Sequence, residues 1–372
     1  MTSIDDLKRL NTPPGFEPGI QWDGDTGHIT VATQGEQPDP EKVNGVIDSS
    51  PFLSSDEVQV DWSARPRVSI HHDDNGNLVQ AWYKLPLVRR PDRQFDVDEL
   101  VDMIGDPAVI HESRGTWRTI LISDTHVGKS EVAGGGSELI AQRWLQSVAN
   151  ALETGYEGVH VALGGDLIEG YVSQGGRNIS ETDLTLTEQI RVTQNLVTKT
   201  IQMCLEHAPQ VVVSVCPGNH GETTRVQGRP MGDSHDIQIV ASVQQAFELA
   251  GKDEVTFYYP EPNRGDVTYK AGDDVFTLVH GHKFGGGKMS GAKKWWAGQV
   301  MNDRPAAASS VLLAGHFHGF EVANVTARKW VVFGPSLETE STWFANQSGA
   351  TSRSGVVCFD MIDGEPRKIS VV

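Results

Sequence analysis

The residues of this chain that could bind metal ions follow five apolar stretches of the sequence. LISDTH contains Asp124 and His126, LGGDLIEG contains Asp166, VCPGNHGE contains Asn219, TLVHGH contains His280, and LLAGHFH contains His316 and His318. Asp, Asn and His without Cys suit manganese, iron or zinc in five- or six-coordinate sites rather than a closed structural zinc site. Each motif alone is a weak signal. Five apolar stretches that all end in oxygen or nitrogen donors indicate a common site.

Two of these donors, His316 and His318, stand on either side of one phenylalanine at the end of a predicted strand. An isolated His-x-His pair is most simply two surface histidines in a loop. In a two-metal site, by contrast, ions about 3.5–4 Å apart hold a phosphoryl group and turn a shared water into hydroxide. Such a site needs a bridging carboxylate, which Asp166 can supply, and the two histidines can then serve adjacent ions. The sequence therefore predicts a dinuclear metal centre.

The elements that must position these donors are buried strands and the helices between them. WRTILISD and GVHVALGGD are near-continuous apolar runs that end in Asp, as expected of strands buried on both faces. Apolar residues at helical spacing predict helices over 141–152, about 183–207 and 235–251. Short strand-like segments follow, from EVTFYY to RKISVV. This order predicts one large α/β domain with two packed sheets and with the donors at the carboxyl ends of strands.

The first part of the chain, residues 1–113, is predicted to be a small α+β appendage without a catalytic motif of its own. Its first 45 residues are rich in Pro, Gly and acidic residues, which indicates turns and a short hairpin. Residues 58–90 alternate apolar and polar side chains around Asn75-Gly76, which is typical of a hairpin. DVDELVDMIGD, residues 96–106, predicts a short helix. The second domain is then expected over 114–372.

The composition limits the classes of protein to consider. The net charge is −18 and more than half of this excess falls in the first 110 residues, which argues against a general nucleic-acid coat or a membrane-surface binder. Three cysteines form no disulfide framework. No apolar run is long enough for a membrane span, and the N-terminal sequence lacks a secretory signal. We therefore expect a protein of the cytoplasm, with no membrane partner.

The ordered motifs D-x-H, G-D-x-x-E, G-N-H, H-G-H and G-H-x-H over residues 118–320 resemble the calcineurin-like metallophosphoesterases. The resemblance implies a four-layer α/β/β/α sandwich and in-line attack of metal-bound hydroxide on phosphorus, without a covalent intermediate. It implies one ion bound by Asp124, His126, Asp166 and His318, and a second bound by Asp166, Asn219, His280 and His316. His220 does not correspond to any metal ligand in the motifs of this family. The resemblance implies that it is catalytic, stabilising charge at the scissile phosphate or protonating the leaving oxygen.

Two positions depart from the usual motifs of this family. Gly221 stands where an acidic residue commonly follows the histidine, and Glu222 comes one place later. Glu169 stands where Asp is common. If an acidic residue normally orients the histidine, the role of Glu222 here is open.

Within the superfamily, the chain is similar to the SbcD-type DNA repair exonucleases and to phosphoesterases of tailed actinobacterial phages. The segments that carry this similarity include SQGGRNISETDLTLTEQIRV and HGHKFGGGKMSGAKKWWAGQ. If the chain is phage-encoded, its location is the host cytoplasm. Assignments of such phage proteins as nucleases rest on analogy, so this similarity says little about the substrate.

Several residues near the motifs are candidates for substrate binding. His282 either approaches a phosphate oxygen or hydrogen-bonds behind the metal ligands. Lys283 begins KFGGGKMSGAKKWW, which is either a Gly-hinged loop that neutralises phosphates and stacks a base, or a lysine face over two core tryptophans. Arg177 and Arg225 lie in Gly-containing loops and could clamp phosphate, although either alone is as readily an ordinary surface arginine. The neighbouring Ser173, Gln174 and Asn178 could contact a sugar or base.

The leading hypothesis is a dinuclear metal-dependent phosphodiesterase that cleaves DNA as an exo- or endonuclease. We expect two divalent ions, manganese first, with iron and zinc as alternatives. One rival is a hydrolase of small phosphoesters, such as cyclic nucleotides, nucleotides or phosphoproteins, for which the acidic balance is less of an obstacle. Another is an interaction protein whose site is only structural, against which the complete donor set argues. The sequence does not fix the oligomeric state, and a homodimer is one assembly to test.

Overall fold

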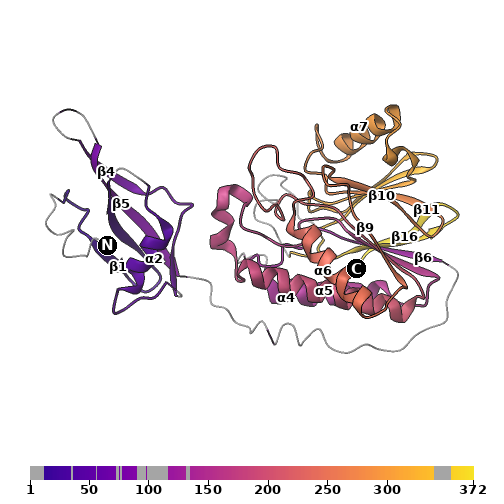
Figure 1. Cartoon of the computed structure of the whole chain (residues 1–372), viewed down its shortest axis with the longest axis horizontal. Coiled ribbons are helices and arrows are strands. Elements are labelled where there is room, and N and C mark those ends of the chain that lie inside the picture. The colour runs from indigo at the N-terminus through magenta and orange to yellow at the C-terminus, as the bar shows by residue number, and fades with distance from the viewer. Residues whose placement is uncertain are drawn as a thin grey trace. The chain divides into compact units, whose positions relative to one another are not determined.

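The structure is a computed structural model that describes residues 12–34, 37–55, 57–72, 75, 78–89, 98, 116–130, 135–338 and 353–372, with Gln174 and Arg177 by their backbone alone. The chain divides into two compact units, residues 1–92 and 93–372 (Figure 1). The predicted boundary near residue 113 and, except for Asp98, the predicted helix 96–106 lie outside the described residues. Both stay predictions.

The first unit is a small sheet with one helix. The elements are β1 (Gly19–Trp22), β2 (Thr26–Thr33), α2 (Pro40–Asp48), β3 (Val58–Val60), β4 (Arg67–His72) and β5 (Leu78–Arg89). The strands run in the order β1-β2-β5-β3, and β4 pairs antiparallel with β5, which confirms the hairpin expected around Asn75-Gly76. Asp39 caps α2 through the backbone N–H of Glu41, and Val43 and Ile47, one turn apart, are buried in the core of this unit.

The second unit contains a six-stranded sheet in the order β16-β15-β6-β7-β8-β9. Its strands are β6 (Trp117–Ile122), β7 (Gly158–Leu163), β8 (Val211–Val215), β9 (Val255–Tyr258), β15 (Val357–Ile362) and β16 (Glu365–Val371). β6 to β9 are parallel, and β15 runs antiparallel to β6. The buried apolar runs predicted as strands are therefore confirmed. Parallel strands bring the loops after β6, β7 and β8 to one edge of the sheet.

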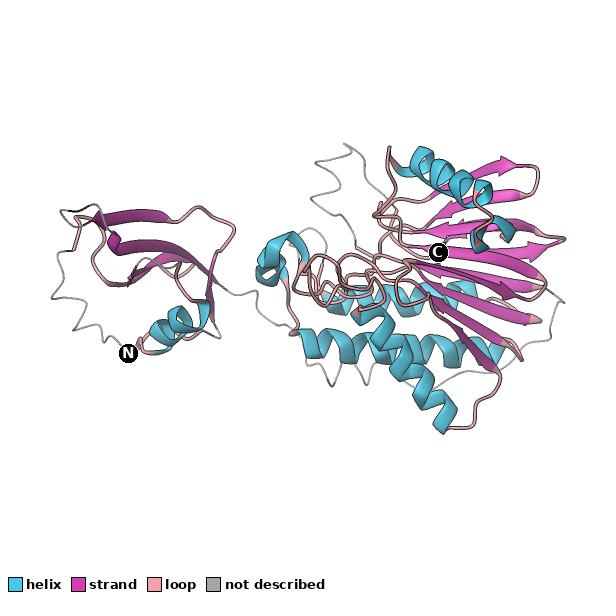
Figure 2. Cartoon of the chain, turned by 45° about the horizontal axis from the view of Figure 1, so that its top comes forward, coloured by secondary structure: helices cyan, strands magenta, loops and turns pink. Residues whose placement is uncertain are grey.

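Three helices pack against one face of this sheet, as Figure 2 shows. They are α4 (Ser137–Ala151), α5 (Leu186–His207) and α6 (His235–Leu249). α5 begins with a capping box in which Thr185 and Glu188 satisfy each other's backbone N–H groups. Ile120 and Ile122 of β6 face these helices, whereas Leu121 faces the other side of the sheet. The three helices confirm the expected helical segments within a few residues of their predicted ends.

A second sheet covers the other face of the first. It runs in the order β10-β11-β12-β14-β13, with β10 (Asp266–Ala271), β11 (Asp274–Val279), β12 (Val311–Ala314), β13 (Glu321–Thr326) and β14 (Lys329–Phe333). The two sheets share a buried cluster that includes Leu121, Phe276 and Leu313. α7 (Lys288–Met301) and the short helix η2 (Pro305–Ala308) pack against the outer face of the second sheet through Trp296 and Ala306. β11 and β12 are parallel, so their carboxyl ends also share one edge.

Candidate metal centre

All seven predicted donors lie in the loops just beyond the carboxyl ends of strands. Those strands are β6, β7 and β8 in one sheet and β11 and β12 in the other. Backbone hydrogen bonds join the loops: the N–H of Asp124 donates to the carbonyl of Gly165, and the N–H of His126 donates to the carbonyl of Asp166. The N–H of Gly315 donates to the carbonyl of His280. The two packed sheets thus bring donors that are far apart in the sequence to one place.

The donors form two groups whose atoms lie within 4.8 Å of one another. One group is Asp124, His126 and His318, and the other is Asp166, His280 and His316. A third group of the same kind joins His126 to Glu169 and His220, and it contains only one predicted donor. In the first group, the Nε2 atoms of His126 and His318 are 3.2 Å apart. In the second, Nε2 of His280 is 3.0 Å from Oδ2 of Asp166 and 3.2 Å from Oδ1 of Asn219. His316 and His318 therefore belong to different groups, as two adjacent ions would require.

Five of these donors have an unusual backbone conformation. The φ angles are 53° at Asp124, 48° at His126, 52° at Asp166, 69° at His316 and 50° at His318. Residues other than glycine rarely adopt this left-handed region, and each such residue costs on the order of 1–3 kcal/mol. Within the described residues, three further non-glycine residues share it, and none is a predicted donor. Strain concentrated on the donors indicates that their placement serves a function.

The chemistry of the donor set fits divalent cations. Asp124, Asp166 and His280 are buried with at most 1 % of their surface exposed. Burial raises the pKa of Asp124 to about 6, although the charge of His280 acts in the opposite sense, and the neighbouring Asp166 carboxylate adds to the rise. Burial, followed by the charge of His280, lowers the pKa of His316 to about 4, so its imidazole is neutral at pH 7 and able to bind a metal. Divalent ions would neutralise the buried carboxylates.

A bridging role for Asp166 is not resolved by this geometry. Its carboxylate belongs to the group with His280 and His316 and not to the other group. Its second oxygen accepts a hydrogen bond of 2.7 Å from the backbone N–H of His220. The bridge between the two ions therefore stays a prediction.

Glu169 links the first group of donors to His220. Its Oε2 atom lies 2.9 Å from Nδ1 of His126 and 3.2 Å from Nδ1 of His220. Although burial acts in the opposite sense, the two imidazoles hold the pKa of Glu169 well below its usual value. Burial also opposes the charged form of His220, yet the carboxylates of Asp166 and Glu169 raise its pKa to about 9. A carboxylate behind a metal-binding histidine fixes which ring nitrogen faces the metal.

His220 lies beside the metal donors without joining either donor group. Its ring is 4.5 Å from the His126 ring in an edge-to-face arrangement. Its Nδ1 atom is 3.1 Å from the carbonyl oxygen of Glu169, and its Nε2 atom is 3.1 Å from the hydroxyl of Ser173. With Nδ1 held by Glu169, Nε2 would contact a substrate in place of the Ser173 hydroxyl. This position suits a group that donates a proton or a hydrogen bond to a phosphoryl oxygen.

The structure explains the departure from the family motifs at Gly221 and Glu222. Glu222 does not orient His220; its carboxylate pairs with Arg225 and Arg229. A Cβ atom on Gly221 would lie 2.4 Å from Oδ2 of the buried Asp236. Asp236 uses its two oxygens to accept hydrogen bonds from the N–H groups of Gly218 (2.8 Å) and Leu167 (3.0 Å), which ties two donor loops together. A carboxylate from α6 thus occupies the space that an acidic side chain at 221 would need.

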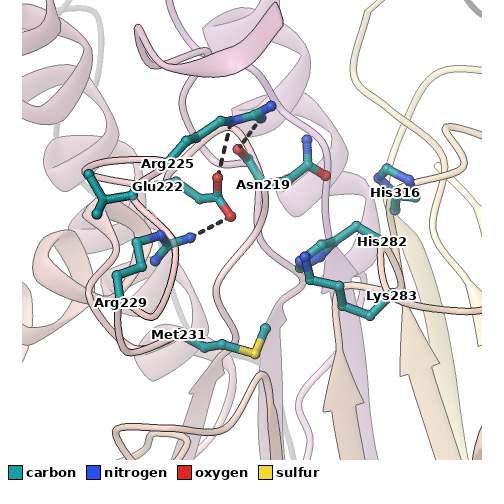
Figure 3. Close-up of a pocket in the computed structure, with 9 residues that line it drawn as sticks. Asn219, Glu222, Arg225, Arg229, Met231, His282, Lys283 and His316 are labelled. Atoms are coloured by element: carbon teal, nitrogen blue, oxygen red, sulfur yellow. Dashed lines mark hydrogen bonds and ion pairs between the residues drawn. The ribbon is translucent and has the colours of Figure 1, made fainter. Parts of the chain in front are cut away.

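Three of the four residues expected to bind substrate line one pocket of about 510 Å³. Figure 3 shows His282 and Lys283 on one side of it and Arg225 on the other. Asn219 and His316 also line the pocket, so it opens onto the metal donors. The side chain of Arg177 lies outside what the structure describes.

The lysine-rich segment is mainly structural. Nζ of Lys288 is 2.5 Å from the carbonyl oxygen of Gly319 and 3.5 Å from the carboxylate of Glu321. Trp296 is buried and Trp295 packs against the same cluster. Lys293 and Lys294 are exposed on α7. The interpretation as a lysine face over core tryptophans therefore fits 288–296, and Lys283 is the lysine of this segment that lines the pocket.

Sequence reasoning missed residues that hold the donors in place. Asn178 was a candidate for base or sugar contacts, but it is buried and its amide donates to the carbonyl and carboxylate oxygens of Glu169, at 3.2 and 3.1 Å. The Ser336 hydroxyl donates to the carbonyl of Asp124, at 2.8 Å. The signal available for Asp236 was its place in the first turn of α6, which also explains it as a helix-start residue.

No protein-family profile matches the chain, and no curated protein matches it. Among solved structures, Vps29 from Entamoeba histolytica complexed with Zn²⁺ is similar at 14% identity and a TM-score of 0.31, over 68% of this chain and 98% of that chain. Vps29 from Cryptosporidium parvum is similar at 11% identity and a TM-score of 0.33, over 69% of this chain and 97% of that chain. Vps29 from Chaetomium thermophilum is similar at 10% identity and a TM-score of 0.35, over 66% of this chain and 85% of that chain. All three TM-scores lie below 0.5.

Among the helices that the structure describes, none combines the length and apolar character needed to cross a membrane.

Proposed function

We propose that the chain is a dinuclear metal-dependent phosphodiesterase. The observation that carries the proposal is the pair of donor groups at the strand ends, Asp124/His126/His318 and Asp166/His280/His316. Two bound divalent ions would polarise the phosphoryl oxygens and lower the pKa of a bound water. Asn219 adds an oxygen donor beside His280. The proposal includes the four-layer α/β/β/α architecture of the calcineurin-like metallophosphoesterases, and manganese as the first metal to test.

The residues around the donors have separate tasks in this proposal. Asp166 would hold both ions. His220, held by Glu169, places Nε2 at the leaving oxygen and donates a proton there. The lining of the adjacent pocket orients the rest of the substrate. The contact of His220 with Glu169 supports the task of His220, and the resemblance to the calcineurin-like metallophosphoesterases implies the bridging task of Asp166.

Nucleic acid, most simply DNA, is the leading substrate class. The cationic residues of the pocket beside the donors support an anionic strand as substrate. A small phosphoester is the second candidate, and the modest volume of about 510 Å³ together with the net charge of −18 supports it. Action in the cytoplasm, a phage or SbcD-like origin and a homodimeric assembly belong to the proposal as expectations.

The first experiment measures bound metal and hydrolysis of bis-p-nitrophenyl phosphate by the full chain with manganese. We expect two ions per chain and turnover that a chelator abolishes. A protein that holds two ions yet leaves the diester intact would contradict catalysis. A panel of labelled single-stranded DNA, duplex DNA, RNA and cyclic nucleotides then separates the two substrate classes by their products.

The bridge is tested by Asp166→Ala. Because both ions would lose a ligand, we expect elemental analysis of the variant to find neither position filled. His316→Ala, which removes a ligand from one group alone, is the matched variant and should retain one ion. Full occupancy of one ion in Asp166→Ala would argue against the bridge.

A further inference from the structure

The pocket beside the metal donors carries more positive charge than the chain as a whole. Its lining includes three cationic side chains, Arg225, Arg229 and Lys283, and one carboxylate, Glu222. The chain itself has a net charge of −18. A locally cationic hollow on an acidic protein favours an anionic ligand by focusing its field there.

Arg229 and Glu222 hold the side chain of Arg225 in place. Arg229 donates to the carbonyl oxygens of Pro230 (3.1 Å) and Asp233 (3.0 Å), and it pairs with Glu222. Glu222 in turn lies 3.2 Å from Nε of Arg225 (Figure 3). With only 12% of its side chain exposed, Glu222 is held at one place. The arrangement therefore limits the positions that the Arg225 guanidinium can adopt.

Arg225 is well suited to bind an anion. Its Nη2 atom donates to the carbonyl oxygen of Asn219 (3.2 Å), and its Nε atom faces Glu222. A guanidinium has five N–H donors, so further donors remain for a ligand. The side chain is 45% exposed. A planar, pre-oriented guanidinium binds phosphate through two parallel hydrogen bonds.

The same pocket reaches the metal donors on one side and has apolar lining on another. Asn219 and His316 line it, and Asn219 is the residue whose carbonyl Arg225 contacts. Val226, 68% exposed, and Met231 also line it. Apolar surface beside cationic groups suits a nucleoside that carries phosphate, and methionine adapts to flat rings.

We propose that this pocket binds a second phosphate of the substrate, one nucleotide away along the strand from the phosphodiester that is cleaved. The inference rests on the proposed function and narrows it: the preferred substrate is a nucleic-acid strand with at least two consecutive phosphates, not a simple diester or a cyclic nucleotide. Arg225 and Lys283 hold the second phosphate, and Glu222 positions Arg225.

The test compares thymidine dinucleotides that share one phosphodiester. TpT carries that group alone, whereas pTpT and TpTp each carry one further phosphate at opposite ends. With the manganese-loaded full chain, we expect kcat/KM for one of the two phosphorylated dinucleotides to exceed that for TpT by about 10–100-fold, the range of charge-assisted hydrogen bonds to phosphate. The end that gives the preference identifies which side of the scissile bond the pocket serves.

Arg225→Gln and Lys283→Gln test the residues. Each should reduce the ratio of kcat/KM for the preferred dinucleotide to that for TpT, with the larger loss for Arg225→Gln and most of it in KM. Arg328→Gln is the matched control, because Arg328 is exposed in the β13–β14 turn, at the end of the sheet away from the donors. Calorimetry with thymidine 3′,5′-bisphosphate and thymidine 5′-monophosphate provides a readout of binding without turnover.

The outcomes separate the inference from the function on which it rests. Hydrolysis of TpT, pTpT and TpTp at equal kcat/KM would overturn the second-phosphate site and leave the phosphodiesterase intact. An unchanged preference in Arg225→Gln would also overturn it. Failure to hydrolyse any dinucleotide or bis-p-nitrophenyl phosphate would overturn the proposed function itself.

Discussion

Glu169 is a single buried carboxylate that serves two imidazoles. Oε2 faces both Nδ1 of His126 and Nδ1 of His220, and Asn178 donates to Oε1. With Nδ1 of His126 engaged, Nε2 is directed at His318, the other imidazole of the first donor group. One residue therefore sets the orientation of a predicted ligand and of the predicted proton donor.

Replacing Glu169 by Gln should weaken metal binding by about 10–100-fold, the usual effect of losing a carboxylate behind a ligating histidine. The neutral amide also no longer supports the positive charge on His220, so turnover at saturating metal should fall as well. Calorimetric titration with manganese measures the first effect. Glu153→Gln, at an exposed position after α4, is the control, and equal metal affinity of the Glu169 variant and this control would contradict the assigned role.

His220→Ala is expected to behave differently from Glu169→Gln. Neither group of predicted donors includes His220, which joins only the group with His126 and Glu169, so metal content should stay that of the wild type. Loss of the proton donor should reduce kcat by about 10²–10⁴-fold. The variant should regain part of its rate on a diester with a good leaving group, which needs no proton. Loss of metal from His220→Ala would show that it is a ligand.

The sequence predicted the donors but not the residues that hold them. Asp124 and His316 are readable because each follows an apolar run that must be a strand. Glu169, Asn178 and Asp236 act on partners in other loops, and their neighbours in the sequence carry no trace of those contacts. Gly221 shows the same limit. The reason for a glycine at this position is the Asp236 carboxylate that lies against it, which the sequence does not reveal.

At the scale of elements, a polar network lies between the two sheets. His160 of β7 hydrogen-bonds to the Tyr269 hydroxyl of β10 (2.8 Å), and the Ser214 hydroxyl of β8 donates to the same oxygen (2.7 Å). Thr119 of β6 contacts the other ring nitrogen of His160, at 3.3 Å. Burial lowers the pKa of His160 to about 3. The network fixes how the sheets register, and burial keeps the imidazole neutral.

This network predicts acid sensitivity of the fold. Between about pH 6.5 and 3, the unfolded chain binds a proton at His160 that the folded chain does not, so stability falls as the pH falls. From pH 7 to 5, this one residue should contribute a loss of about 2 kcal/mol in the free energy of unfolding. The variant His160→Gln has no imidazole to titrate at this position. Between pH 7 and 5, its free energy of unfolding should therefore fall by about 2 kcal/mol less than that of the wild type. Urea unfolding followed by tryptophan fluorescence measures the difference.

The exposed His71→Gln is the control for this prediction and should follow the wild type. Parallel stability curves for the wild type and His160→Gln between pH 7 and 5 would contradict the buried neutral histidine.

Most elements were readable from the sequence, and the exceptions have physical reasons. α5 carries a capping box and a long apolar face, which pattern analysis detects. α7 has no side-chain cap and buries Gly291, Ala292 and Trp296, so its sequence lacks a regular apolar stripe. The helix η1 (Ser173–Glu181) contains two glycines at positive φ, Gly175 and Gly176, which indicate a loop when read alone. Packing, rather than the local conformational preference of the residues, determines the structure of α7 and η1.

At the scale of the whole molecule, the chain has two units with separate cores. The buried cluster of the first unit includes Ile29, Ile47 and Leu87. The clusters of the second unit draw their residues from 117–372. All seven metal donors and His220 lie in the second unit. Separate cores imply that each unit gains its stability from its own residues.

Removing residues 1–92 should therefore leave the second unit folded and active on a small diester. We expect its melting temperature, metal content and kcat/KM for bis-p-nitrophenyl phosphate to match those of the full chain, since no described residue of the first unit belongs to the core or the site of the second. The matched control replaces Leu87 by Asp in the full chain, which should unfold the first unit alone. If the truncated chain lost metal or turnover while the Leu87→Asp chain kept both, residues 1–92 would contribute directly to the site, contrary to this separation.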